Sequence, residues 1–272
     1  MLPMRSVVRL ASLARASSSA STVSSTPPTT THFGFETVAE EEKAKKVATV
    51  FTGVAEKYDL MNDAMSMGIH RLWKDYFVQS LPLRANAKIL DVAGGTGDIS
   101  FRHARRFPKS QVTVSDINAD MLRVGEARAL KDPKVDASRL SWVVADGEKL
   151  PFEDNTFDAY TISFGIRNCT HVDQVVREAQ RVLKPGGLFA CLEFSRINSL
   201  LAPIYDAYSF QVIPVMGEIL AKDYNSYKYL VESIRKFPGQ EEFAALITNA
   251  GLKGVKYENL SFGICAIHTA RK

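Results

Sequence analysis

The segment that most constrains the fold spans residues 88–98 and reads Lys-Ile-Leu-Asp-Val-Ala-Gly-Gly-Thr-Gly-Asp. A short apolar run typical of a buried strand leads into a glycine-rich turn, and a helical pattern begins near Asp98. Glycines allow the backbone to approach a ligand closely, and the first turn of a helix offers free amide donors. The segment therefore predicts a strand–turn–helix unit whose turn binds a small ligand.

The remainder of the chain alternates strand-like and helical patterns. We expect strands at 88–92, 111–115, 140–145, 157–163, 187–194, 254–258 and 263–269. We expect helices at 98–107, 119–130, 172–183 and 240–249, and helical periodicity also runs through 37–79. This alternation predicts an α/β fold with a doubly wound parallel sheet of seven strands. Only residues 259–262 separate the last two strands, too few for a crossover, so that pair must be antiparallel.

The glycine spacing and one acidic residue indicate the class of ligand. The dinucleotide pattern G-x-G-x-x-G could begin at Gly95 and Gly97, but Ser100 stands where its third glycine belongs. Asp91 precedes the turn, and its carboxylate suits a cationic amine and would repel a pyrophosphate. S-adenosylmethionine carries an ammonium and a sulfonium and has no phosphate. The segment therefore favours S-adenosylmethionine over NAD.

Two further acidic residues end the next two strands. Asp116 follows Gly97 by 19 residues and could accept hydrogen bonds from ribose hydroxyls. Asp146, which precedes Gly147, could accept one from an adenine amino group. Each residue alone is more often a cap or turn residue. Three carboxylates at the carboxyl ends of successive strands, where open α/β sheets bind ligands, predict a cofactor site.

The first 31 residues differ in composition from the rest. They contain three arginines and no acidic residue, with 12 Ser or Thr between residues 12 and 31. Arg9 and Arg15 interrupt the apolar run that a secretory signal needs, so residues 1–31 are interpreted as a mitochondrial transit peptide. A plastid transit peptide and a disordered tail without a targeting role are the alternatives.

Composition excludes several classes of protein. Three of the four net positive charges lie in the leader, so the body offers no charge argument for nucleic acid binding. No apolar stretch approaches the roughly 20 residues of a membrane-spanning helix. Cys169, Cys191 and Cys265 are too widely spaced for a disulfide framework or a Cys-x-x-Cys zinc site, and we expect no metal site.

Several segments resemble the ubiquinone/menaquinone-biosynthesis C-methyltransferase family. They are residues 31–39, 58–74, 93–98, 162–168, 192–195 and 227–240. The likeness covers everything after the leader, here residues 32–272. It implies a class I methyltransferase fold, a Rossmann-like seven-stranded sheet with an antiparallel last strand, an N-terminal helical segment at 32–80 and a helical lid insertion at 197–236. It also implies S-adenosylmethionine-dependent C-methylation of 2-methoxy-6-polyprenyl-1,4-benzoquinol in ubiquinone biosynthesis.

The resemblance also implies which residues contact the cofactor. These are Thr96, Asp116, Asp146, Gly147 and Ser163, to which the glycine turn adds Asp91, Gly95 and Gly97. Ala93 replaces the first glycine of the general methyltransferase loop, and we expect no cofactor contact from it.

The chemistry requires help in ionising the acceptor. A ring carbon is a weak nucleophile until a ring hydroxyl is deprotonated, and phenols have a pKa near 10. Arg167 remains protonated and could stabilise the phenolate or orient water. His70 is the preferred base, with Tyr58 and Asp59 as alternatives. The ordinary alternatives are a structural His70 and an Arg167 held in a salt bridge to a neighbouring helix.

Residues 200–220 are rich in apolar side chains and could line a path for the polyprenyl tail, forming a lid together with the first helices. An ordinary packed insertion and a protein-binding surface are alternatives. With no spanning segment, membrane contact would be peripheral. The resemblance implies a multi-enzyme assembly with other coenzyme Q biosynthesis proteins on the matrix face of the mitochondrial inner membrane, and we also consider a homodimer.

Three other functions compete with this interpretation. An NAD-dependent oxidoreductase is disfavoured by the glycine spacing and the antiparallel last pair. An RNA methyltransferase is disfavoured because the sequence shows no basic patch. The chain also has neither an Asn-Pro-Pro-Tyr-type motif nor a Pro-Cys nucleophile. A non-catalytic scaffold of quinone-biosynthesis enzymes would bind cofactor or quinone without turnover.

Overall fold

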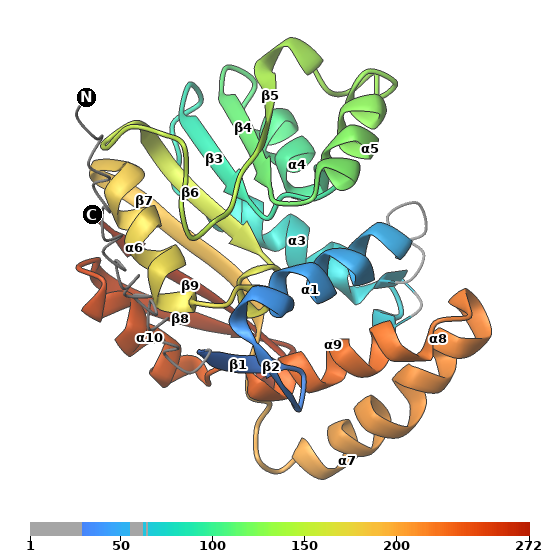
Figure 1. Cartoon of the computed structure of the whole chain (residues 1–272). Helices are drawn as coiled ribbons and strands as arrows, with labels where there is room; N and C mark the ends of the chain where they lie inside the picture. The colour runs from blue at the N-terminus through green and yellow to red at the C-terminus, as the bar shows by residue number, and fades with distance from the viewer. Residues whose placement is uncertain (1–28, 55–61, 64) are drawn as a thin grey trace, which may run out of the picture.

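The computed structural model describes residues 29–54, 62–63 and 65–272 (Figure 1). The predicted transit peptide, except for its last three residues, and the alternative bases Tyr58 and Asp59 lie outside the described residues. No helix in the described part of the chain is long and apolar enough to cross a membrane.

A seven-stranded sheet forms the centre of the molecule, as predicted. Its strands lie in the order β5-β4-β3-β6-β7-β9-β8, and only β9 runs antiparallel to its neighbours. Every predicted strand is present, with ends shifted by at most four residues. The strands are β3 (Lys88–Val92), β4 (Gln111–Asp116), β5 (Leu140–Val144), β6 (Phe157–Ser163), β7 (Leu183–Phe194), β8 (Lys253–Leu260) and β9 (Cys265–Arg271).

Helices cover both faces of the sheet because alternate residues of each strand point to opposite sides. Ile89 packs in a core with Phe77 and Phe101, whereas Leu90 packs in the other core with Val176 and Phe243. The first core lies under α3 (Ile69–Ser80), α4 (Asp98–Arg106) and α5 (Ala119–Ala129). The second lies under α6 (Val172–Val182) and α10 (Gln240–Asn249).

The N-terminal segment differs from the predicted helical pattern. β1 (Thr30–Phe33) begins inside the predicted leader and pairs antiparallel with β2 (Glu36–Ala39), and helix α1 (Glu40–Val54) begins only after this hairpin. Gly34 adopts φ +60° in the turn, a conformation that favours glycine. The Phe33 ring stacks on Tyr229 with 4.0 Å between centroids. The hairpin thus packs on residues about 200 positions away, which local periodicity cannot reveal.

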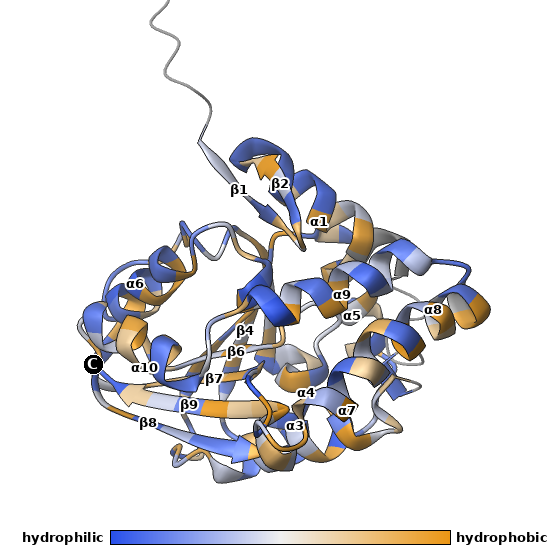
Figure 2. Cartoon of the chain, turned by 90° about the horizontal axis from the view of Figure 1, so that it is seen from below, coloured by the Kyte–Doolittle hydropathy of each residue, from blue (hydrophilic) through white to orange (hydrophobic). Residues whose placement is uncertain are grey.

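The predicted insertion is helical and lies beyond the carboxyl ends of the strands, near α1 (Figure 1). It contains α7 (Ala202–Ala207), a π-helical turn (Tyr208–Val212), α8 (Ile213–Ala221) and α9 (Tyr224–Lys236). Pro203 and Pro214 stand in the first turns of α7 and α8, where a proline leaves no necessary hydrogen bond unmade. Figure 2 shows apolar stretches along α7 and α8 in a view from below.

Candidate active site

Two adjoining cavities lie at the carboxyl ends of the parallel strands. The first, of about 330 Å³, is formed by the ends of β3, β4, β5 and β6 under α1. The second, of about 480 Å³, lies between α3, the insertion helices and residues 261–264. Lys74 and Phe164 line both cavities. Two ligands bound in them would therefore meet beside these two side chains.

Asp91 lies at the base of the first cavity and is almost fully buried, with 1% of its surface exposed. Its carboxylate accepts hydrogen bonds from the Ser100 hydroxyl at 2.6 Å and the Thr161 hydroxyl at 2.9 Å. Burial outweighs these hydrogen bonds and raises the pKa of Asp91 to about 7. Because no cationic side chain pairs with it in the described chain, a cationic ligand would stabilise its ionised form.

Asp116 ends β4 and holds the glycine turn in place. Its two carboxylate oxygens accept hydrogen bonds from the backbone amides of Gly95 at 2.9 Å and Asn118 at 2.8 Å. Burial raises its pKa, and the backbone hydrogen bonds oppose this shift. The carboxylate is therefore fixed at the cavity edge and retains lone pairs for hydroxyl donors.

The structure brings most of the other predicted cofactor residues to the same cavity. Thr96, Asp146, Gly147 and Ser163 all line it, although the Thr96 hydroxyl already accepts a hydrogen bond from Arg128 at 3.2 Å. The buried Ser163 Oγ has no hydrogen-bond partner among the described residues, as expected of an atom that contacts a ligand.

Gly97 does not line the cavity, in contrast to the other predicted residues. It begins α4 with φ +82°, and a Cβ atom there would lie 2.8 Å from Trp142. It is therefore a packing glycine. Ala93, for which the sequence predicts no contact, does line the cavity and adopts φ +51°.

Helix α1 covers the first cavity, a contribution that the sequence did not reveal. Ala44, Val47 and Ala48 line the cavity. The buried Lys43 donates to the backbone carbonyl of Cys169 at 2.8 Å and so ties the helix to the loop after β6. Burial lowers the pKa of Lys43.

The charges around this first cavity define what it can bind. Its acidic lining residues are Glu40, Asp91, Asp98, Asp116, Asp146 and Glu148. Among the described residues, its lining contains one lysine, Lys74, and no arginine. Such a lining fits a cationic, phosphate-free molecule with hydroxyl and amino donors, and it opposes a pyrophosphate.

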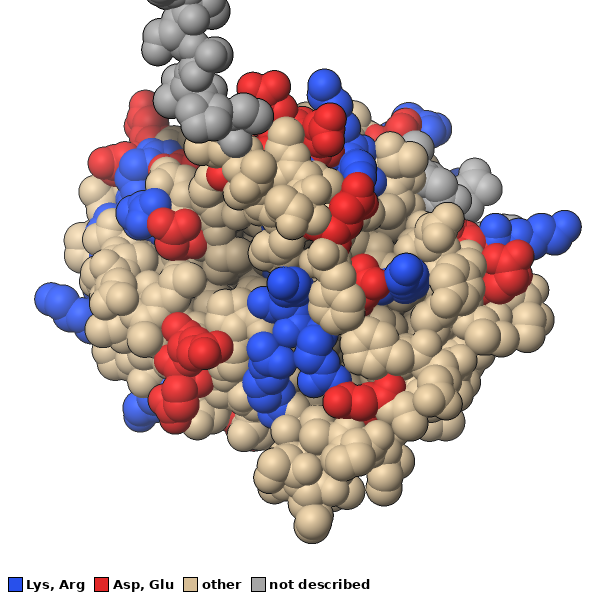
Figure 3. Space-filling view, turned by 60° about the horizontal axis from the view of Figure 1, so that its bottom comes forward, with Lys and Arg blue, Asp and Glu red and all other residues tan. Residues whose placement is uncertain are grey.

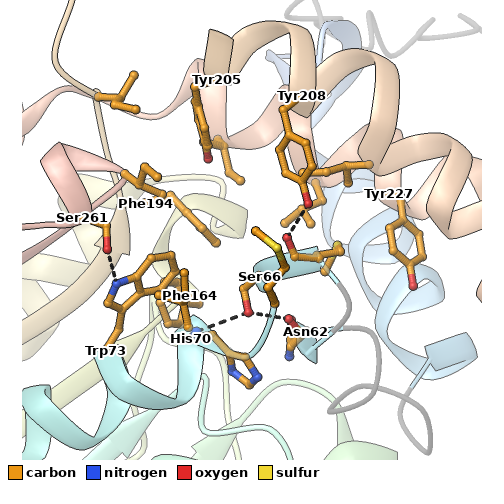
Figure 4. Close-up of a pocket in the computed structure, with 18 of the residues that line it drawn as sticks. Asn62, Ser66, His70, Trp73, Phe164, Phe194, Tyr205, Tyr208, Tyr227 and Ser261 are labelled. Carbon is orange, nitrogen blue, oxygen red and sulfur yellow. Dashed lines mark hydrogen bonds between the residues drawn. The ribbon is translucent and has the colours of Figure 1, made fainter. Parts of the chain in front are cut away.

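The second cavity is mainly apolar, as Figure 4 shows. Trp73, Phe164 and Phe194 group on one side, with 4.8 Å between the Phe164 and Phe194 centroids. Tyr205 and Tyr208 descend from the insertion on another side. The cavity therefore suits an aromatic ring with a hydrocarbon substituent, and residues 200–220 contribute to it as the sequence predicts.

His70 lines this apolar cavity and is held by an acidic neighbour. Its Nε2 lies 2.8 Å from an Asp63 oxygen, and its buried Nδ1 has no partner in the described chain. Burial and the nearby Lys74 lower the pKa of His70, despite the opposing effect of Asp63. The neutral ring would donate from Nε2 to Asp63, which leaves Nδ1 as a free proton acceptor.

Arg167 lines the same cavity and is committed to a buried ion pair. Its Nη1 lies 3.1 Å from Glu193 on β7 and also donates to the Phe164 carbonyl, while Nε donates to Ser233. The salt-bridge partner is thus a strand residue and not the helix residue considered above. None of the hydrogen bonds found within the described chain uses Nη2 of Arg167, so this group remains available.

Sequence reasoning missed Lys74, Asp63 and Glu193. Lys74 and His70 are four residues apart, the spacing that places two side chains on one face of a helix. This spacing can be read from the sequence, but it does not show which face of the helix borders a cavity. Glu193 lies in a segment that carries the family resemblance, but nothing in the sequence around it indicates that it pairs with Arg167.

Comparisons with known proteins agree with this geometry. The sequence profile of the ubiE/COQ5 methyltransferase family matches residues 37–272. A curated Caenorhabditis elegans protein, "2-methoxy-6-polyprenyl-1,4-benzoquinol methylase, mitochondrial", is 63% identical over 91% of this chain and 87% of its own length. Its Drosophila melanogaster namesake is 56% identical over 89% and 85%. A SAM-dependent methyltransferase structure from Thermotoga maritima superposes with a TM-score of 0.56 at 19% identity, covering 82% of this chain and 99% of that one, and shows the fold alone.

The close approach of Gly165 to Ala93 predicts a compensating pair of substitutions. Gly165 has φ −120°, which any residue adopts, but a Cβ added there would lie 2.4 Å from the Ala93 Cβ. We expect Gly165→Ala to lower the free energy of unfolding by about 1–3 kcal/mol through overpacking. The double variant Gly165→Ala/Ala93→Gly should recover most of this loss in urea denaturation.

Ala93→Gly alone is the control and should unfold close to wild type, because relief of the positive φ offsets the added entropy of the unfolded chain. A double variant as unstable as Gly165→Ala would contradict the contact.

Proposed function

Because the chain belongs to the ubiE/COQ5 methyltransferase family, we propose that it methylates a ring carbon of 2-methoxy-6-polyprenyl-1,4-benzoquinol in ubiquinone biosynthesis. The methyl donor is S-adenosylmethionine. The observation that carries the proposal is the pairing of an acidic cavity with an apolar one through Lys74 and Phe164. The first has the chemistry for a cationic donor and the second for a prenylated ring.

We assign the cofactor's functional groups to the carboxylates of the first cavity. Asp91 binds the ammonium, Asp116 the ribose hydroxyls and Asp146 the adenine amino group. Gly95 lets the backbone approach, and the Ser163 hydroxyl, which has no partner among the described residues, supplies a further contact. When bound, the cofactor supplies a sulfonium methyl group whose leaving group departs neutral. The protein then contributes mainly by positioning and by exclusion of water.

We assign the polyprenyl tail to the apolar cavity and its opening. Met67, Ile204 and Phe262 line this cavity and are each more than 70% exposed. The adjacent Leu200 is 84% exposed. In Figure 3, a projection without visible charged side chains borders both basic and acidic ones. The exposed apolar side chains support peripheral contact with a membrane, through which a membrane-dissolved tail could enter the cavity.

The acceptor is activated by proton transfer to His70. Nδ1 takes the proton of a ring hydroxyl, and Asp63 stabilises the resulting imidazolium through Nε2. The electron pair of the ring carbon would form the new bond to the methyl group that the bound donor supplies, with the donor's carbon–sulfur bond broken and its pair left on sulfur. The ring-carbon proton would pass to water at the cavity opening, which restores aromaticity, and His70 would return its proton to the ring oxygen. Arg167 orients the more distant acceptor oxygen, or a water bound to it, through Nη2.

The curated relatives are named mitochondrial, in agreement with the composition of the leader. We propose a location on the matrix face of the inner membrane. There the protein would associate with other coenzyme Q biosynthesis proteins, and a homodimer is one form of this assembly. The apolar surface at the cavity opening supports contact with either lipid or a partner protein.

The proposed reaction predicts turnover by the isolated protein. With methyl-labelled S-adenosylmethionine and 2-methoxy-6-geranyl-1,4-benzoquinol, we expect one label per acceptor, on a ring carbon, by mass spectrometry. An acceptor deuterated at both open ring carbons should lose one deuterium. A labelled methyl group on a ring oxygen would contradict the reaction and favour an O-methyltransferase. Tight cofactor binding without any turnover would contradict it and favour a scaffold.

The assignment of His70 predicts a specific kinetic defect. His70→Ala should lower kcat about 100-fold or more at neutral pH, with a smaller fall for Asp63→Asn. Because the pKa of His70 is lowered, wild-type kcat should stay constant as pH falls toward 6.5 and decline only below it. The variant should lose this acidic decline and gain activity as pH rises.

His32→Ala provides a matched control because His32 lies on β1 and lines neither cavity. It should keep wild-type kcat and pH dependence. A His70→Ala enzyme with the wild-type rate and acidic decline would remove His70 from the mechanism.

A further inference from the structure

Lys74 occupies a position that neither the fold nor the cofactor site explains. It follows His70 by one helical turn on α3, and both residues are 5% exposed. Both line the apolar cavity, but Lys74 also lines the acidic one. A buried lysine is therefore placed where donor and acceptor would meet.

The hydrogen bonds of Lys74 leave part of its ammonium available. Nζ donates to Asp98 at 2.8 Å and lies 6.0 Å from the centroid of the Phe164 ring. An ammonium has three donors, and only one hydrogen bond from Nζ is found in the described chain. Burial opposes ionisation of Asp98, but Lys74 and Arg102 outweigh it and lower the pKa of Asp98 to about 2. The ion pair therefore keeps Lys74 oriented without saturating it.

The acceptor's own geometry places an oxygen beside Lys74. In a 2-methoxy-6-polyprenyl-1,4-benzoquinol the open ring carbons are 3 and 5, and both flank the carbon that bears the 4-hydroxyl. Whichever carbon is methylated, the 4-oxygen must lie next to the junction of the cavities. Arg167 lines only the apolar cavity, and its Nη1 and Nε are bonded to Glu193, Phe164 and Ser233.

We propose that Lys74 binds the ionised 4-oxygen of the acceptor, beside the ring carbon that receives the methyl group. This inference rests on the proposed function. His70, on the same helix face, takes the proton of that hydroxyl, and Lys74 stabilises the charge left on oxygen. The charge spreads to the neighbouring ring carbon and makes it nucleophilic. Lys74 thus contacts the reacting ring and is a catalytic residue.

The charged groups around Lys74 lie on three segments. His70 precedes it on α3, Asp63 pairs with His70 from before this helix begins, and Asp98, with its partner Arg102, faces it from α4. Lys74 lowers the pKa of His70, so a Lys74 variant also shifts the His70 titration and moves the acidic decline of kcat to higher pH. The ionisation of a bound phenol is therefore the readout that reports on the ammonium itself, beside the kinetics.

A chromophoric analogue measures the proposed contact without turnover. In 3-geranyl-4-nitrophenol the nitro group replaces the 1-hydroxyl, and the phenolate absorbs visible light. Titrated in the presence of S-adenosylhomocysteine, the bound analogue should ionise about one pH unit or more below the free compound. Lys74→Met should lower the ionisation constant of the bound analogue about tenfold or more, back toward that of the free compound. Lys74→Arg should keep most of the wild-type shift.

Kinetics give a second readout. Lys74→Met should lower kcat about 10- to 100-fold near neutral pH, with a smaller change in KM, and the deficit should shrink as pH approaches the phenol's own pKa. Lys45→Met, which removes an exposed lysine on α1, is the matched control and should leave both readouts unchanged. Lys74→Met leaves the Asp98 carboxylate without its lysine partner. The double variant Lys74→Met/Asp98→Asn therefore tests the loss of the ammonium with the charge of Asp98 also removed.

The outcomes separate this inference from the proposed function. Wild-type methylation of the quinol together with unchanged analogue ionisation in both Lys74→Met variants would overturn the role of Lys74 and leave the function intact. Failure of wild type to methylate the quinol would overturn the function, whatever the analogue shows. A kcat deficit of the same size at every pH would also contradict a phenolate contact.

Discussion

The burial of a carboxylate near the carboxyl end of strand β3 is the constraint on which the site depends. Asp91 is hydrogen-bonded by two hydroxyls and paired with no cationic side chain in the described chain, so its ionised form is poorly stabilised. An unpaired buried charge is strongly unfavourable unless a ligand compensates it. The neighbouring carboxylates of Asp116 and Asp146 likewise favour a ligand with hydrogen-bond donors or a positive charge. A phosphate-bearing dinucleotide would meet the wrong sign of charge.

The division into an acidic and an apolar cavity explains how one fold can hold two unlike molecules. The parallel strands supply the acidic half, since their carboxyl ends converge at one edge of the sheet. The apolar half is built from α3 and the insertion helices, which the sheet alone would not provide. Helix α3 contributes His70 and Lys74 from one face. The residues proposed to ionise the acceptor are thus positioned by a rigid element that packs in the core through Phe77.

Much of the fold, and the meeting of most of the predicted cofactor residues at one cavity, could be predicted from sequence because the signals are local. Strand 88–92, strand 157–163 and helix 240–249 have the predicted bounds, since short apolar runs and helical periodicity mark them directly. The β-hairpin at residues 30–39 was missed because its stability comes from contacts with α9. Gly97 was assigned to the ligand although its backbone conformation and the nearby Trp142 explain it. Lys74 and Glu193 depend on side chains brought together by the fold, and no spacing rule reveals their partners.

The central claim is that Asp91 binds a cationic group of the cofactor. Calorimetric titration with S-adenosylhomocysteine in buffers of different ionisation enthalpy measures it directly. Because the pKa of free Asp91 is about 7, binding should release nearly one proton at about pH 6 and far less at about pH 8. Asp91→Asn should bind about tenfold more weakly or worse and show no such pH dependence, while the exposed Asp173→Asn should match wild type. Equal affinity and equal proton release in wild type and Asp91→Asn would contradict the account.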